Sequence, residues 1–158
     1  MSPWRASAAM IAVILMLAGS AIADSATERD PGDVLGTWRF QTKPYRGGQC
    51  IMSGLMHLRD APESGVYDCE LTALEVCSLW GRSLVRQSCE ARRFGNQVSV
   101  RSSIEEFLET KSELEGYTFN YVPDNFALTV QSAERMYGSL VSAITAPVEF
   151  RRTEEGVS

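Results

Sequence analysis

Short runs of alternating apolar and polar residues dominate the chain from residue 35 onward. A period of two places successive side chains on opposite faces of a β-strand, so these runs predict strands with one buried face. Residues that favour turns separate them, notably 44–48, Phe94-Gly95-Asn96 and Pro123-Asp124-Asn125. The predicted strands are 35–41, 50–58, 65–73, 83–92, 97–105, 117–122, 126–131, 135–142 and 147–152.

The regular spacing of these short strands predicts an all-β domain, either a sandwich or a barrel. We favour an up-and-down antiparallel barrel of eight or nine strands, because closure removes exposed strand edges from an exported protein. The first strand, 35–41, and the last, 147–152, would then pair. Three segments also have apolar residues close to helical spacing, and a helix remains the alternative for 71–80, 103–114 and 133–144.

The first 23 residues have the pattern of a secretory signal peptide. Arg5 supplies a positive charge, 8–18 is apolar, and Ala21-Ile22-Ala23 provides the small residues of a cleavage site. An uncleaved anchor is disfavoured, because a spanning helix needs roughly 20 apolar residues. We therefore expect a periplasmic or secreted protein with no transmembrane segment after cleavage. The remaining divisions are a disordered lead-in at 24–34, a barrel domain at 35–152 and a disordered tail at 153–158.

Composition excludes several other classes of protein. The chain is 44% hydrophobic and 22% charged, which is too apolar for a disordered tail. Its formal net charge is -5, whereas a general nucleic-acid binder shows a basic excess, so nucleic acid is not an expected partner.

All four cysteines lie in the predicted barrel, and an even number in an exported chain predicts disulfides. A zinc site is disfavoured, because no two cysteines have the spacing of a C-x2-4-C knuckle. Folding 65–73 onto 83–91 sets Cys69 opposite Cys89, both facing inward. Folding 50–58 back near residue 62 brings Cys50 towards Cys77. We predict these two pairings from strand parity and turn position.

The two ends of the predicted barrel carry a resemblance to lipocalins. Gly36-Thr37-Trp38 opens the first strand, and Phe150-Arg151-Arg152 closes the last. In lipocalins a Gly-x-Trp motif begins the barrel, and an arginine of the last strand packs over that tryptophan. The resemblance implies barrel-end packing by Gly36, Trp38 and Arg151, with a cation–π contact between the last two.

The chain is also similar to the small exported barrels that inhibit bacterial metalloproteases. Those proteins insert a free N-terminal segment into the protease cleft. This second resemblance implies an exported protease as partner, with residues 24–34 as the inserted segment.

The inward face of the predicted barrel is rich in methionine and aromatic residues, which form adaptable apolar pockets. Such an interior either packs solid or holds one small hydrophobic ligand. The candidate interior residues are Phe40, Met52, Met56, Tyr67, Phe119, Tyr121 and Phe150.

Residues for catalysis are sparse. The single histidine, His57, is predicted on the outer face, and Ser53 in the same strand lies about 13 Å away, too far for a nucleophile–base pair. The acidic residues from Glu105 to Glu115 cluster between predicted strands. They form either a patch for a cation or a basic partner or a solvated acidic loop, and we favour the loop because no calcium-loop pattern is present. No nucleotide-binding or hydrolase motif is present, and we expect neither a metal nor another cofactor.

Three functions stay open at this point. The first is an exported, non-enzymatic lipocalin-like binding barrel for a small apolar ligand, or an envelope-structural barrel without one. The second is an inhibitor of an exported protease. The third, which we rank last, is an enzyme.

Overall fold

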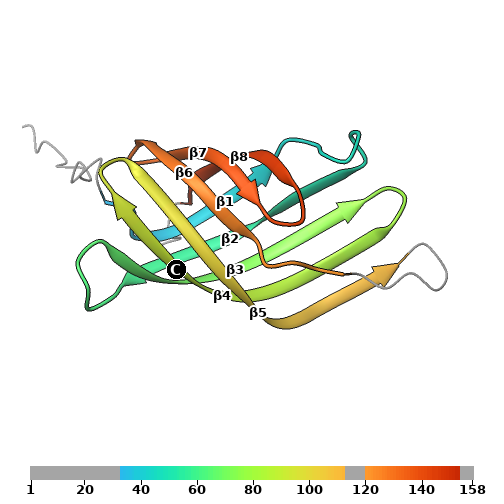
Figure 1. Ribbon diagram of the computed structural model, residues 1–158, viewed down its shortest axis with the longest axis horizontal. Helices are drawn as coiled ribbons and strands as arrows, with labels where there is room; N and C mark the ends of the chain where they lie inside the picture. The colour runs from blue at the N-terminus through green and yellow to red at the C-terminus, as the bar shows by residue number, and fades with distance from the viewer. Residues whose placement is uncertain (1–32, 113–119, 154–158) are drawn as a thin grey trace, which may run out of the picture.

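The computed structural model describes residues 33–112 and 120–153. Within these ranges the chain forms eight antiparallel strands that close into an up-and-down barrel, each strand pairing with its neighbours in sequence and β1 pairing with β8 (Figure 1). The strands are β1 (Gly36–Thr42), β2 (Cys50–Asp60), β3 (Val66–Cys77), β4 (Gly81–Phe94), β5 (Gln97–Ser112), β6 (Asn125–Ser132), β7 (Arg135–Val141) and β8 (Thr145–Arg152).

The predicted all-β barrel is therefore confirmed, with eight strands. Residues 120–122, the described half of the predicted strand at 117–122, form no strand, and residues 117–119 lie outside the described ranges. The helical alternatives are wrong: 71–77, 103–112 and 135–141 all belong to strands. Pairing with neighbouring strands satisfies their backbone groups and overrides the local helical spacing.

Several expectations about the ends of the chain lie outside the described residues. These are the signal peptide, most of the 24–34 segment with its proposed protease contact, and residues 154–158 of the tail. Val34, which we placed in the lead-in, is buried in the core, so the packed domain begins before residue 35. None of the described residues belongs to a helix of the length and apolar character needed to cross a membrane.

Alternation decides which side chains fill the barrel. In β2 the inward positions are Cys50, Met52, Gly54, Met56 and Leu58, as the sequence pattern predicts. Gly54 is required by close packing, since a Cβ there would lie 2.0 Å from the carbonyl oxygen of Thr72 and 2.7 Å from the Phe40 ring. The missing side chain thus makes room for an aromatic residue of β1.

The hairpin between β4 and β5 shows how one glycine sets the register. Phe94 pairs with Gln97 across a two-residue turn, and Gly95 has a φ of 60°. A positive φ is costly for most residues and free for glycine, so the predicted tight turn forms here. Two register shifts further along β5 then bend this strand.

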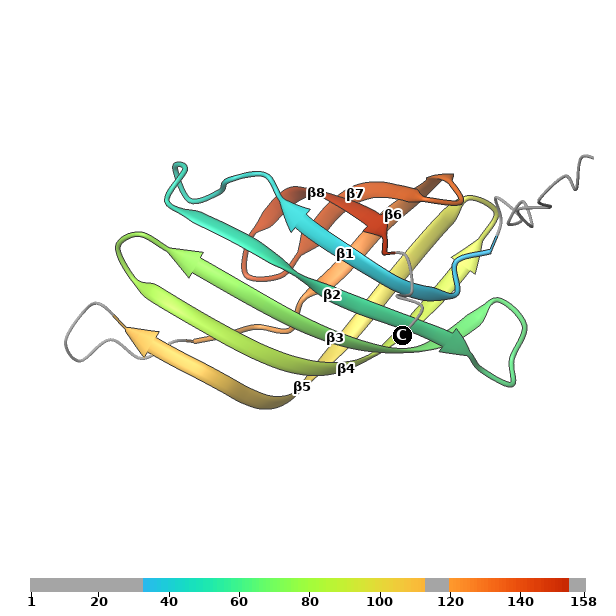
Figure 2. The same cartoon turned by 180° about the vertical axis from the view of Figure 1, so that it is seen from behind.

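The bend carries the second half of β5 away from β6. These two strands pair only over Gln97–Val100, the shortest ladder of the barrel, whereas β5 stays paired with β4 up to Ser112. Figures 1 and 2 show this half of β5 diverging from β6 in both views. The segment leading into β6, residues 120–124, therefore lies beside the barrel wall without forming a strand.

Candidate functional site

One end of the barrel is plugged by Trp38. The guanidinium of Arg152 lies 4.4 Å from the centroid of its ring, and the indole Nε1 donates a hydrogen bond of 2.9 Å to the carbonyl oxygen of Val34. Arg152 also donates to the backbone carbonyls of Leu35, Asp33 and Ala133.

The expected partner of Trp38 was Arg151, and that expectation is wrong. Phe150 points into the core, so alternation turns Arg151 outward, where its side chain is 69% exposed and pairs with Glu149. Arg152 is the inward residue. Gly36 takes part as expected, because a Cβ at that position would lie 3.3 Å from Nη1 of Arg152.

Both predicted disulfides are present, Cys50–Cys77 and Cys69–Cys89. They lie at opposite ends of β3 and face inward, one joining β3 to β2 and the other joining β3 to β4. Glu75 and the first of these disulfides form the only group of metal-ligand residue types found in the described ranges. The bonded sulfurs are not thiolates, so this group is not a metal site.

The middle of the barrel is filled by aromatic rings. Phe40 stacks on Phe150 with centroids 5.0 Å apart, and Phe126 meets both rings edge-on at 5.3 and 5.2 Å. Met52 and Met56 are buried around this cluster. Of the remaining interior candidates, Tyr67 and Tyr121 are half-buried, and Phe119 lies outside the described residues.

Polar side chains gather at the other end, the mouth. We call Tyr45, Glu75, Gln87, Tyr121 and Asp124 the mouth cluster. Tyr45 donates a hydrogen bond of 2.5 Å to Glu75 Oε1, and Tyr121 donates one of 2.5 Å to Asp124 Oδ2. Gln87 Nε2 donates to the same Oδ2 at 2.6 Å, while its Oε1 accepts from the backbone N–H of Asp124 at 2.9 Å. These bonds hold two carboxylates and two phenols at one end of the core.

Local sequence explains how Asp124 enters the barrel. Pro123 lacks the N–H that a central strand needs, and 120–124 stays irregular. The divergence of β5 from β6 leaves room for the inserted residue, and Ser102 of β5 bonds the Asp124 carbonyl at 2.6 Å and the Asn125 side chain at 2.9 Å. Side-chain bonds thus replace the strand ladder at this point.

Burial has a clear electrostatic effect on the mouth cluster. Desolvation is the main cause that raises the pKa of Asp124, with a smaller contribution from the nearby Glu75, while the Tyr121, Gln87 and Ser142 side chains oppose the change; the resulting pKa is about 6. Burial and the adjoining carboxylates also raise the pKa values of Tyr45 and Tyr121, so both phenols stay protonated at neutral pH. Asp124 Oδ1 is buried and accepts no hydrogen bond from the described residues.

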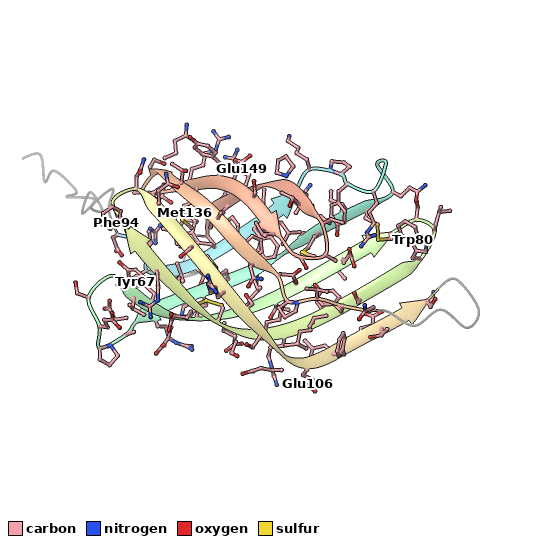
Figure 3. All side chains as sticks on the ribbon, in the orientation of Figure 1. Tyr67, Trp80, Phe94, Glu106, Met136 and Glu149 are labelled. Carbon is pink, nitrogen blue, oxygen red and sulfur yellow. A yellow bond between two sulfur atoms is a disulfide. The ribbon has the colours of Figure 1, made fainter. Side chains whose placement is uncertain are left out.

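A small pocket of about 30 Å³ opens beside this cluster. It is lined by Tyr45, Glu75, Tyr121 and Asp124, and by apolar side chains that include Met52, Leu140 and Ile144. Arg46 lines the same pocket and lies 5.6 Å from the Trp80 ring, which Figure 3 labels at the end of β3. The volume suits one small polar group and not a whole organic molecule.

The sequence did not reveal this site. Asp124 sits in a Pro-Asp-Asn run that predicts a surface turn, and Gln87 was not among the candidate residues. One signal was available: alternation with Val85 and Cys89 puts the polar Gln87 on the inward face of its strand.

A second polar pair was also missed. Thr37 Oγ1 lies 2.8 Å from Nδ1 of His57 on the outer wall, because β1 and β2 pair these residues directly. Neither residue lines a pocket that the structure reveals.

The acidic run resolves into ion pairs with β4. Glu109 pairs with Arg82 at 3.1 Å, and Glu106 pairs with Arg86 at 2.6 Å; Figure 3 shows Glu106 on the outside of the bend in β5. These acids are exposed, as expected, but Glu105, Glu106 and Glu109 belong to β5 and not to a loop between strands. The rest of the run, at residues 113–115, is outside the described ranges.

Comparisons with known proteins support the fold alone. A redesigned β-barrel aligns with a TM-score of 0.50 and 14% identity, covering 76% of this chain and 91% of that one. The barrel EF1p2_mFAP2b, in a structure bound to DFHBI, aligns with a TM-score of 0.50 and 12% identity, covering 75% of this chain and 93% of that one. No protein-family model matches the sequence. No curated protein matches it either.

Proposed function

We propose that this protein is an exported, non-catalytic binding barrel whose mouth takes the amine end of a small molecule. The observation that carries the proposal is Asp124 Oδ1, a buried carboxylate oxygen that the described residues leave without a hydrogen bond, in a side chain that lines a pocket. Buried polar atoms are nearly always satisfied, so an unsatisfied one beside a pocket indicates a missing donor.

The hydrogen-bond directions of the mouth cluster define the ligand's chemistry. Tyr45 and Tyr121 already donate their only protons to the two carboxylates, so their oxygens have only acceptor capacity left. The second oxygens of Glu75 and Asp124 are acceptors as well. A group that offers several donors and a positive charge, such as an ammonium, matches this set best.

The pocket volume limits the contact to a head group. About 30 Å³ accommodates an ammonium, and the rest of the ligand would lie along Ile144 and Trp80 at the edge of the mouth. This differs from our expectation of an apolar ligand deep in the barrel, because the aromatic cluster occupies that space. A barrel of similar fold has been solved bound to DFHBI, so the architecture is compatible with small-molecule binding.

Two further features support export. The paired cysteines leave no free thiol in the described residues, and disulfides of this kind persist in oxidising compartments. The predicted signal peptide leads to the same compartment. We therefore propose that binding takes place in the periplasm or outside the cell.

Thermal shift of the mature chain tests the binding proposal, with butylammonium, butyrate and butanol as matched probes. We expect only the amine to stabilise the protein, since ligands that bind the native state raise its melting temperature. Asp124→Asn should abolish the shift. His57→Ala, on the outer wall, should leave it unchanged. A shift of equal size with butanol, or one that persists in Asp124→Asn, would overturn the proposal.

A further inference from the structure

The outer wall of the barrel carries a row of three arginines. Arg39 of β1 pairs with Arg151 of β8, and Arg151 pairs with Arg135 of β7, so the three lie side by side across three strands. All three point outward, away from Phe40, Phe150 and Met136 in the core. Like charges placed directly opposite each other destabilise a sheet, so packing gives no reason for this row.

Only part of this charge is compensated. Glu149 pairs with Arg135 at 2.9 Å and with Arg151 at 2.6 Å. No ion-pair partner of Arg39 is found among the residues that the structure describes. Lys43, the residue after β1, adds a fourth cation about 13 Å from Arg39 by the rise of a strand. A strongly basic surface has therefore formed on a chain whose formal net charge is -5.

The arginine row borders a groove of about 710 Å³ on this face. Its lining combines the four cations and Glu149 with Gln41, Ile51, Pro44, Pro147 and Tyr137. The Tyr137 ring is 48% exposed and lies next to Glu149, since the two residues pair across β7 and β8. Figure 3 shows Glu149 on the outer side of these strands, clear of the mouth where Trp80 is labelled.

The pairing of the strands restricts what this groove can bind. β1, β7 and β8 are each hydrogen-bonded to a neighbour on both sides, so their backbones cannot take up an added peptide strand. Recognition must use side chains alone. Guanidinium groups bind carboxylates in a bidentate manner, Gln41 and Glu149 offer partners for hydroxyl groups, and the exposed Tyr137 ring offers an apolar face.

From the arginine row and its groove, we propose that the outer face of β1, β7 and β8 binds an anionic polysaccharide. Carboxylate groups of its sugars pair with Arg39 and with the outer sides of Arg151 and Arg135, while a sugar ring lies on Tyr137. This site lies on the opposite side of the wall from the mouth cluster, and it does not depend on the amine site.

Binding of the mature chain to polygalacturonate, measured by affinity electrophoresis at low and moderate salt, tests the proposal. We expect retardation that weakens as salt rises, because exposed charges are screened. Arg39→Gln should weaken binding about tenfold, and the double variant Arg39→Gln/Arg151→Gln should abolish it. Arg59→Gln, a charge-matched change on another strand, should bind as the parent does, and circular dichroism should show that all variants keep the fold.

Three further probes make the result specific: uncharged dextran, poly-glutamate and vesicles of phosphatidylglycerol. Dextran should not bind, and the other two should bind more weakly than polygalacturonate. The proposal is overturned if polygalacturonate fails to bind, if Arg39→Gln/Arg151→Gln binds as well as the parent, or if poly-glutamate or the vesicles bind more tightly.

Discussion

Arg152, on the last strand, covers the indole ring of Trp38 on the first, with its guanidinium carbon 4.4 Å from the ring centroid. The Arg152 side chain is only 3% exposed, and it donates to backbone carbonyls of Asp33 and Leu35 before β1 and of Ala133 in the β6–β7 turn. One side chain thereby joins the seam between β1 and β8 to the N-terminal segment and to the β6–β7 turn.

Replacing Arg152 should weaken the fold strongly. Arg152→Ala removes the cation–π contact and leaves buried carbonyl oxygens unpaired, so we expect a loss of about 2–4 kcal/mol in the free energy of unfolding. Arg151→Ala should change it by less than about 0.5 kcal/mol, because that side chain lies on the surface. Urea titration of both variants measures the difference, and equal effects would contradict the assigned roles.

Removing either disulfide should also destabilise the protein. The bridges close loops with sequence separations of 27 and 20 residues, so chain entropy predicts a contribution of about 3–4 kcal/mol from each. We expect the Cys50→Ala/Cys77→Ala and Cys69→Ala/Cys89→Ala variants to show losses of this size in urea titrations without reductant. A variant as stable as the parent would show that its bridge does not constrain the unfolded chain.

Gly54 provides a test of core packing. Gly54→Ala places a methyl group against the Thr72 carbonyl and the Phe40 ring, and we expect a loss of about 2–3 kcal/mol from overpacking. Ser53→Ala, one residue earlier and on the outer wall, is the matched control and should be almost neutral. The melting temperatures of the two variants compare them directly. An unaffected Gly54→Ala variant would mean that the Phe40 ring moves aside without cost.

Asp124 should make stability depend on pH between about 4 and 6. Its pKa is about 6 in the folded protein and about 4 in an unfolded chain, so the folded state binds more protons over this interval. The free energy of unfolding should therefore fall as pH rises through it, by up to about 3 kcal/mol from this group.

Urea titrations from pH 4 to pH 8 measure this dependence. Asp124→Asn cannot ionise, so its curve should lack the decline that the parent shows. Glu75→Gln should retain a smaller decline, since burial of Asp124 remains the main cause. Parallel curves for the parent and Asp124→Asn would show that another group is responsible.

The sequence pattern predicted the parts of the fold that depend on alternation. Parity placed Cys69 and Cys89 on inward faces, and a hairpin turn near Leu79 set them opposite each other, so the sequence predicted this disulfide. The same alternation places Arg151 on the outer face, because its neighbour Phe150 faces inward. The wrong arginine was chosen because the resemblance to lipocalins, and not parity, guided that assignment.

Two features of the structure could not be predicted from the alternation of hydrophobic and polar residues. Asp124 enters the barrel from an irregular segment, where no period tells inward from outward. The arginine row exists only because β1, β8 and β7 bring residues 39, 151 and 135 into one register, and that register depends on loops and bulges along the whole chain. Alternation along the sequence therefore predicts the barrel but neither of the two candidate binding sites.

The short ladder between β5 and β6 has a consequence for solubility. Beyond Val100, no described strand pairs with the side of β5 that faces β6, where Ser102 instead bonds Asp124 and Asn125. An edge without a strand partner is a template for aggregation with other copies. Glu105, Glu106 and Glu109 project from the same stretch. Charged residues discourage a second chain from pairing with a strand edge. These glutamates therefore protect the part of β5 that lacks a strand partner from edge-to-edge aggregation.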